Sequence, residues 1–324
     1  MSTSSTILVI GATGKQGGSV LTELSNLLPT LSPQPKVKVL ALTRTASSPK
    51  AQALARQHPA LDLEVVEGDS REPGPLFAAH PAITTVFSYT TPPDEEPQAA
   101  ALVDAAAAHA RSQKSKVHFV FSSVDRGGEP KSWDTPTDVE HFAQKHNVEV
   151  RLRSACEASG GSMTYTILRP VAFMDNLNPS TFGTVFAALW YTMPSSTKLQ
   201  LVSVRDIGLF AAKALLHPDA PEHRNRAVGL AGDELTLDEA RATFKRVSGG
   251  DELSQAWQVV GWGVRNVVAG RHVGKMFSWF ERGGYGVDVA ALRALEPRLQ
   301  SFEAWLRESS RFAFSKAEKG KAEK

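Results

Sequence analysis

Three glycines at three-residue intervals follow the first apolar run of the chain. The segment Gly11 to Gly17 reads GATGKQG and comes directly after the run Thr6 to Ile10. Where such a segment joins a strand to a helix, the first glycine permits a tight turn and the second lets the backbone approach a pyrophosphate. The third lets the helix pack closely, and free N–H groups at the helix start attract phosphate. The segment therefore predicts a dinucleotide site; the alternative is a turn-and-packing loop without a ligand.

The residue that follows the second apolar run indicates which nicotinamide cofactor would bind. Val37 to Thr43 is followed by Arg44, and no acidic residue occurs before Asp62. An acidic side chain at this point would bind a ribose 2′-hydroxyl, whereas an arginine accommodates a 2′-phosphate. Arg44 therefore favours NADP(H) over NAD(H). The alternative is an ordinary surface arginine after a strand.

Two further loops follow predicted strands. Asp69 and Ser70 come after the third apolar run and would lie beside the adenine; the alternative for Asp69 is an acidic residue of a surface loop. Tyr89, Thr90 and Thr91 come after the fourth run and would border the middle of the cofactor. Open α/β sheets bind ligands at the carboxyl ends of their strands, where these loops would lie.

Residues that could transfer a proton or hold a ribose lie further along the chain. Ser122 and Ser123 end the fifth apolar run. His141 and Lys145 are four residues apart in a predicted helix, so they share one face. Lys145 could hydrogen-bond the nicotinamide ribose, and His141 or Ser123 could serve in acid–base chemistry. The alternative for His141 is an ordinary helix-surface histidine.

Composition excludes several classes of protein and site. Lys plus Arg number 36 and Asp plus Glu 34, a net charge of +2, which argues against binding nucleic acid. The single cysteine, Cys156, excludes an internal disulfide and a cysteine-built zinc site, and we expect it to be a core residue. No histidine spacing typical of a metal site occurs, so we predict no metal.

Apolar runs alternate with helix-forming stretches through the first half of the chain, which predicts an α/β fold with a doubly wound parallel sheet. A smaller, mainly helical C-terminal lobe would follow. A long helix is expected from Thr137 to the pair Gly160-Gly161, and the apolar segment Asn176 to Thr197 is expected to be a loop with a short helix. The predicted strands are Thr6–Ile10, Val37–Thr43, Leu61–Val66, Thr84–Ser88, Val117–Ser122 and Tyr165–Leu168.

We expect a cofactor-binding domain over residues 1–170 and a substrate or partner lobe over 171–314, partly interleaved with it. Residues 315–324 hold four lysines, two glutamates and no large apolar side chain, which is typical of a disordered tail. The segment Leu253 to Val268 has apolar residues at helical spacing, which indicates packing; a hydrophobic lid or partner surface is the alternative. No targeting or membrane-spanning segment is evident, so we expect a cytoplasmic protein and leave the nucleus open.

The chain resembles the NmrA-like family, an atypical branch of the short-chain dehydrogenase/reductases. The motifs that carry this resemblance span Gly11–Val20, Phe119–Val124, His141–Lys145, Thr166–Leu177, Asp206–Gly208 and Gly284–Arg293.

The resemblance implies a Rossmann-type fold that binds NADP(H). It assigns the phosphates to the glycine loop, the 2′-phosphate to Arg44, the adenine surroundings to Asp69 and the nicotinamide ribose to Lys145. The loop residues implied are Gly11, Ala12, Thr13, Gly14, Lys15, Gln16 and Gly17. The residues implied beside the nicotinamide are Pro170, Val171, Ala172 and Phe173.

One departure leaves two functions open. Typical short-chain reductases carry Tyr-x-x-x-Lys with the tyrosine as proton donor, whereas this chain has His141-x-x-x-Lys145. The first hypothesis is an NADP(H)-dependent oxidoreductase of a small carbonyl, enone or quinone compound, acting in a biosynthetic pathway. The second is a non-catalytic NADP(H)-sensing regulator that binds a transcription factor or another protein.

Overall fold

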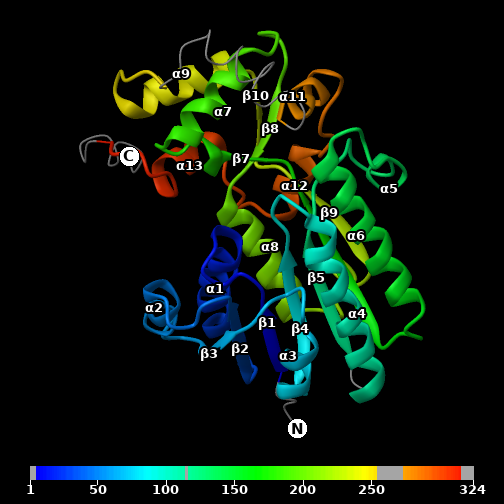
Figure 1. Ribbon diagram of the computed structural model, residues 1–324. Coiled ribbons are helices and arrows are strands. Elements are labelled where there is room, and N and C mark those ends of the chain that lie inside the picture. Colours follow the sequence, from blue (N-terminus) through cyan, green and yellow to red (C-terminus); the bar gives the residue numbers. More distant parts are fainter. Residues whose placement is uncertain (1–4, 114–115, 254–272, 315–324) are drawn as a thin grey trace. The chain divides into compact units, whose positions relative to one another are not determined.

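A seven-stranded sheet forms the centre of the fold in the computed structural model, which describes residues 5–113, 116–253 and 273–314 (Figure 1). The strand order is β3-β2-β1-β4-β5-β6-β9, and β1 to β6 pair in parallel. The predicted α/β fold with a doubly wound parallel sheet is therefore confirmed. The strands are β1 (Ser5–Val9), β2 (Val37–Thr43), β3 (Asp62–Glu67), β4 (Ile83–Tyr89), β5 (Val117–Ser122), β6 (Met163–Pro170) and β9 (Arg226–Leu230).

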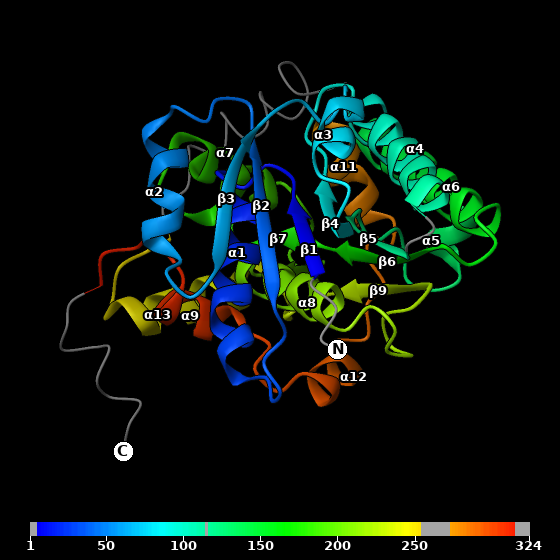
Figure 2. The ribbon, with the colours of Figure 1, turned by 90° about the horizontal axis from the view of Figure 1, so that it is seen from below.

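Helices cover both faces of this sheet (Figure 2). The helices α4 (Glu95–Gln113) and α6 (Glu140–Glu157) lie on one face, and α1 (Lys15–Leu27) and α8 (Val204–Leu216) lie on the other. Every residue of β5 is buried, as expected for a parallel strand covered on both sides. The strand order reverses between β1 and β4, which places a crevice at their carboxyl ends. The shorter helices of this part are η1 (Leu28–Thr30), α2 (Pro49–Gln57) and α3 (Gly74–Ala79).

The start of α6 differs from the prediction. The helix begins at Glu140, three residues after Thr137. Thr137 has a φ of 71°, in the left-handed region, and its hydroxyl accepts a 3.3 Å hydrogen bond from the Val139 N–H. Thr137 therefore belongs to a local turn before the helix, in which its hydroxyl accepts a backbone hydrogen bond.

The chain divides into two compact units and passes between them several times. The first unit holds residues 1–124, 141–169 and 207–228, and the second holds 125–140, 170–206 and 229–324. The second unit contains a three-stranded sheet of order β10-β8-β7. Its strands are β7 (Ala172–Phe173), β8 (Leu199–Val202) and β10 (Asp233–Leu235). Its helices are α5 (Lys131–Asp134), η2 (Met174–Leu177), α7 (Thr181–Tyr191), α9 (Leu237–Ser248), α11 (Val273–Glu281), α12 (Val289–Leu295) and α13 (Phe302–Glu308).

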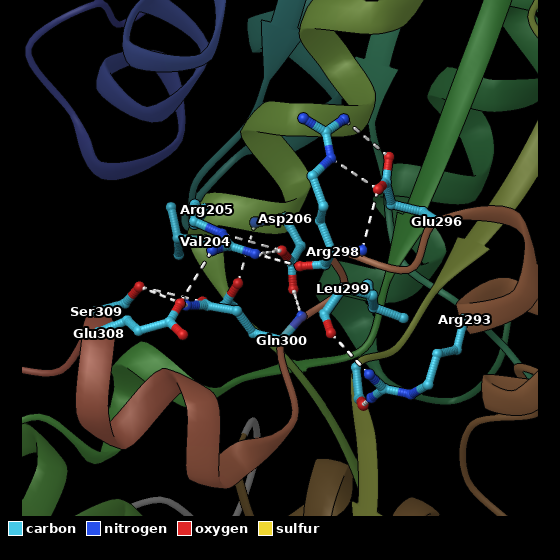
Figure 3. A network of polar contacts seen from close by, with 12 residues as sticks. Val204, Arg205, Asp206, Arg293, Glu296, Arg298, Leu299, Gln300, Glu308 and Ser309 are labelled. Carbon is cyan, nitrogen blue, oxygen red and sulfur yellow. Dashed lines mark hydrogen bonds and ion pairs between the residues drawn. The ribbon is translucent and has the colours of Figure 1, made fainter. Parts of the chain in front are cut away.

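A polar network holds the segment before α13 in the second unit (Figure 3). The fully buried Asp206 accepts hydrogen bonds from the Gln300 N–H at 2.9 Å and from the Arg205 guanidinium at 3.1 Å. Burial raises the pKa of Asp206, and these hydrogen bonds oppose that rise. The side chain of Gln300 donates in turn to Glu308 and Ser309, each at 2.9 Å. Asp206 thus links the first turn of α8 to the C-terminal segment.

Two predicted segments lie outside the described residues. They are the tail 315–324 and nearly all of the tryptophan-bearing segment 253–268. Across the described ranges, no helix has the length and apolarity needed to cross a membrane.

Candidate functional site

A cavity of about 540 Å³ lies in the first unit, at the carboxyl ends of β1 to β4. Eight of the residues predicted to bind the cofactor line it together, from four separate loops. They are Gly11, Thr13, Gly14, Arg44, Asp69, Ser70, Tyr89 and Thr91. Sequence reasoning did not include Arg71 or Gln98, which line the same cavity.

The glycine loop has the geometry that its spacing predicts. Gly11 has a φ of 60°, a conformation that side chains rarely adopt. A Cβ added at Gly17 would overlap the Gly11 carbonyl and lie 2.9 Å from the Ile10 carbonyl oxygen, so this glycine lets α1 pack against the end of β1. Gly14 caps α1 without a side-chain hydrogen bond, and the first turn holds no acidic residue. Uncapped N–H groups of this kind suit a phosphate.

The other residues of the loop have different surroundings. Ala12 is fully buried and its N–H donates to the Leu42 carbonyl at 3.1 Å, whereas Lys15 is exposed. The buried side chain of Gln16 accepts a 2.6 Å hydrogen bond from the Ser122 hydroxyl. Gln16 therefore ties the start of α1 to the end of β5.

The predicted adenosine end of the cavity carries charge of both signs. Arg44 is exposed directly after β2, and Arg71 is exposed two residues after Asp69. The Asp69 carboxylate accepts a 2.9 Å hydrogen bond from the Arg71 N–H, which fixes the turn after β3. The Gly68 N–H donates to the Thr43 carbonyl at 3.0 Å, so the β2 and β3 loops lie side by side. Two guanidinium groups and one carboxylate make this end of the cavity suited to an anion.

Lys145 occupies a buried polar cluster between α6 and the start of α4. Its ammonium lies 2.6 Å from Glu95 Oε2 and 2.8 Å from the Thr90 hydroxyl, with the Thr90 carbonyl at 3.3 Å. The Thr90 hydroxyl also donates to Glu95 Oε2 at 2.5 Å. Glu95 is 1% exposed, and its Oε1 has no hydrogen-bond partner among the described residues. The structure thus brings Thr90 and Lys145 together around a carboxylate that sequence reasoning did not include.

Ser123 lies in a second buried cluster. Its hydroxyl donates a short hydrogen bond to Glu149 of α6, and the Arg169 guanidinium donates to the same carboxylate at 2.7 Å. Both charged side chains are essentially unexposed. The Ser123 hydroxyl therefore forms its hydrogen bond inside the protein, with the buried Glu149.

His141 and Cys156 lie at other positions on α6. His141 is half-buried, one turn before Lys145, and its ring meets the Phe142 ring edge-on at 4.5 Å between centroids. Burial raises the pKa of the Cys156 thiol to about 12, so this residue is not a thiolate at neutral pH. Among the described residues, no group of three His, Cys, Asp or Glu side chains could hold a metal ion.

The predicted nicotinamide residues belong to the second unit. Pro170 ends β6, Val171 donates its N–H to the Leu230 carbonyl at 3.2 Å, and Ala172 and Phe173 form β7. All but Phe173 are buried.

Besides Arg71 and Gln98, the sequence analysis did not identify three buried charged residues, Glu95, Glu149 and Arg169. Glu95, the first residue of α4, pairs with Lys145 of α6, and residues so far apart in the chain leave no local pattern that marks them as partners. Glu149 and Arg169 are 20 residues apart and pair only through the packing of α6 against β6. The one sequence signal was a charged residue, Arg169, at the end of an apolar strand, because a charge there needs a partner.

Comparisons with known proteins identify the family of the chain. The profile of the NmrA-like family matches residues 3–296. An NAD(P)H azoreductase of Xenophilus azovorans is 29% identical over 245 residues, which cover 75% of this chain and 74% of the relative.

Solved structures share the fold at lower identity. An NADPH-dependent quinone oxidoreductase from Escherichia coli, complexed with NADPH, has a TM-score of 0.64 and 19% identity, covering 92% of this chain and 97% of that one. The triphenylmethane reductase of Citrobacter sp., complexed with NADP(H), gives 0.64 and 19%, with coverages of 93% and 97%. NmrA, a negative transcriptional regulator in complex with NADP, gives 0.65 and 16%, with 95% of each chain covered.

Proposed function

The chain belongs to the NmrA-like family, and we propose that it is an NADP(H)-dependent reductase of a small conjugated organic compound, such as a carbonyl, enone or quinone. The observation that carries this proposal is the 540 Å³ cavity, which joins the glycine loop to Arg44. A glycine loop can bind a pyrophosphate, and an arginine after β2 can bind a 2′-phosphate.

Each predicted residue has a role in this proposal. The glycine loop and the uncapped start of α1 hold the pyrophosphate, and Arg44 pairs with the 2′-phosphate. Asp69 and Ser70 flank the adenine, while Tyr89, Thr90 and Thr91 border the middle of the cofactor. Pro170 to Phe173 contact the nicotinamide. When bound, NADPH supplies the hydride that reduces the substrate.

The proton would come from α6 and not from a tyrosine. Ser123 already donates its proton to Glu149, which leaves its oxygen lone pairs for other contacts. His141 is half-buried and lies one helical turn from Lys145. We therefore assign the proton to His141, and we assign to Lys145 the binding of the nicotinamide ribose.

The relatives support the class of substrate. Those named as enzymes are an azoreductase, a quinone oxidoreductase and a triphenylmethane reductase. Azo, quinone and triphenylmethane compounds share an extended conjugated system that can accept a hydride. We propose the same class of acceptor here.

A turnover assay tests this function. Purified protein is incubated with NADPH and a panel of quinones, enones, aryl ketones and azo dyes, and the loss of NADPH absorbance is followed. We expect oxidation with at least one quinone or azo compound, and a lower rate for His141→Ala than for His146→Ala, the matched control five residues further along α6. Tight NADPH binding without oxidation by any acceptor would contradict the catalytic proposal.

A second function is a cofactor-dependent regulator without catalysis. The observation in its favour is that both Lys145 and Ser123 already bond to buried carboxylates, which is a structural use of residues expected to be catalytic. The similar NmrA protein is a negative transcriptional regulator. A pull-down from cell extract with and without NADPH or NADP tests this role. A partner, such as a transcription factor, whose capture depends on the cofactor is expected; capture that is indifferent to it would contradict the role.

A further inference from the structure

The side chain of Tyr89 lies directly on the glycine loop. Tyr89 is the last residue of β4, and its hydroxyl donates a 3.4 Å hydrogen bond to the Gly11 carbonyl. A Cβ added at Gly11 would lie 2.5 Å from Tyr89 Oη and 2.8 Å from Cε1. A Cβ added at Gly14 would meet the same hydroxyl even more closely. The phenol therefore faces both glycines at contact distance.

The face that the phenol covers is the one a pyrophosphate needs. The second glycine of this motif lacks a Cβ so that the backbone can approach the pyrophosphate. In this structure the atom that lies where the Gly14 Cβ would point is Tyr89 Oη. The phenol and a pyrophosphate cannot occupy this space together.

We propose that Tyr89 is a gate on the dinucleotide site, which must leave the glycine loop before a pyrophosphate can bind there. This inference rests on the proposed function, because it takes NADP(H) as the ligand of the cavity. It adds a conformational step to binding, in which the open form is only a fraction of the free protein. The measured affinity for the whole dinucleotide is reduced by that fraction.

The contacts of Tyr89 are weak enough for the gate to open. Its hydrogen bond to Gly11 is long for an O–H donor. Burial raises the pKa of Tyr89, and the charge of Arg44 opposes that rise, so the phenol stays neutral at physiological pH. A phosphate would bring charge-assisted hydrogen bonds to the helix start, which are about twice as strong as neutral ones. The ring is only partly buried, so it can turn out of the cavity.

The gate should affect NADPH but not adenosine 2′-monophosphate, although both ligands contain a 2′-phosphorylated adenosine. Adenosine 2′-monophosphate carries the adenine and the 2′-phosphate, which Asp69 and Arg44 would contact, but it has no pyrophosphate. It can therefore bind while the phenol stays on the glycine loop, whereas NADPH cannot.

Titration of both ligands tests the gate. Wild type, Tyr89→Phe and Tyr89→Ala are titrated with NADPH and with adenosine 2′-monophosphate by calorimetry. We expect Tyr89→Ala to bind NADPH at least about threefold more tightly, because no closed fraction remains. Its affinity for adenosine 2′-monophosphate should stay that of the wild type. Tyr89→Phe loses only the hydroxyl nearest Gly14, so it should give a smaller gain in NADPH affinity. This variant tests the gate if Tyr89→Ala does not fold.

Two outcomes separate failure of the gate from failure of the function. If adenosine 2′-monophosphate binds all three proteins and NADPH affinity is unchanged or weaker in the variants, the gate is wrong and Tyr89 instead supports the cofactor. If the wild type binds neither ligand, the proposed NADP(H) function fails, and the gate fails with it.

Discussion

Lys145 and Glu95 form a buried ion pair, with the ammonium 2.6 Å from the carboxylate. Together with the hydroxyl and the carbonyl of Thr90, Glu95 occupies the three donor positions of the ammonium. Contact with a ribose hydroxyl would therefore require an exchange of partners. The longest of the three contacts, to the Thr90 carbonyl at 3.3 Å, is the one most readily exchanged.

Removing the ammonium should destabilise the protein. Lys145→Met leaves the Glu95 carboxylate buried without its cation, and we expect a loss of about 3 kcal/mol in the free energy of unfolding. The double variant Lys145→Met/Glu95→Leu should recover part of that loss, because it removes both buried charges. Urea denaturation measures each value. Arg151→Met, which breaks an ion pair whose two side chains are both about half exposed, is the control and should lose far less.

Gly17 and Gly18 should respond differently to the same substitution. A Cβ at Gly17 would overlap backbone atoms of Gly11, whereas a Cβ at Gly18 would meet only the Ala12 carbonyl at an ordinary 3.6 Å. We expect Gly17→Ala to lose about 1–3 kcal/mol of stability and its affinity for NADPH. Gly18→Ala, within α1, should be neutral or slightly stabilising. Thermal unfolding and NADPH titration measure the two variants. If Gly17→Ala and Gly18→Ala changed the stability and the NADPH affinity equally, the proposed need for a close approach of α1 to β1 would be contradicted.

Acid should destabilise the fold through His118. Burial, aided by the charge of His223, lowers the pKa of His118 to about 3, and its ring nitrogens bond the hydroxyls of Thr164 and Thr166 at 2.8 and 2.9 Å. The unfolded chain therefore binds more protons than the folded chain between the ordinary histidine pKa and about pH 3. Stability contributed by the neutral ring is fully present above about pH 6.5 and falls as the pH falls.

The expected size of this effect follows from the same linkage. From pH 6.5 to pH 5, His118 should lower the free energy of unfolding by up to about 2 kcal/mol. Urea denaturation across this range should give a shallower slope for His118→Asn than for the wild type. Burial also lowers the pKa of His58 and His109, so some slope should remain. If the free energy of unfolding of His118→Asn fell with pH as steeply as that of the wild type, the assignment of this pH dependence to His118 would be contradicted.

The local features of the fold were predictable from the sequence because each depends on neighbouring residues. The glycine loop, Arg44 after β2 and the apolar run of β5 each have a signature within a few positions. The small sheet of β7, β8 and β10 was not predicted, since its strands are only two to four residues long and pair across the chain. Strands this short have too few residues to show a periodicity.

The surroundings of the candidate residues were less predictable. Spacing placed His141 and Lys145 on one helical face, but it could not show that Lys145 meets Glu95, which lies 50 residues earlier. It also placed Tyr89 in the cavity without showing that its phenol lies on the glycine loop. Such contacts depend on side-chain packing between distant segments, for which a single sequence has no local signal.

The measurement that tests the account most directly is the affinity of Arg44→Ala for the four nicotinamide dinucleotides. Wild type, Arg44→Ala and Arg56→Ala are titrated with NADPH, NADP, NADH and NAD by fluorescence or calorimetry. Arg56 is an exposed arginine on α2 outside the cavity and controls for the loss of charge. We predict that the wild type prefers NADPH to NADH. Arg44→Ala, unlike Arg56→Ala, should weaken NADPH binding about tenfold or more, because a charged hydrogen bond is lost. NADH binding should be unchanged in both variants. Equal NADPH affinity in wild type and Arg44→Ala, or no binding of any dinucleotide, would contradict the assignment of this cavity to NADP(H).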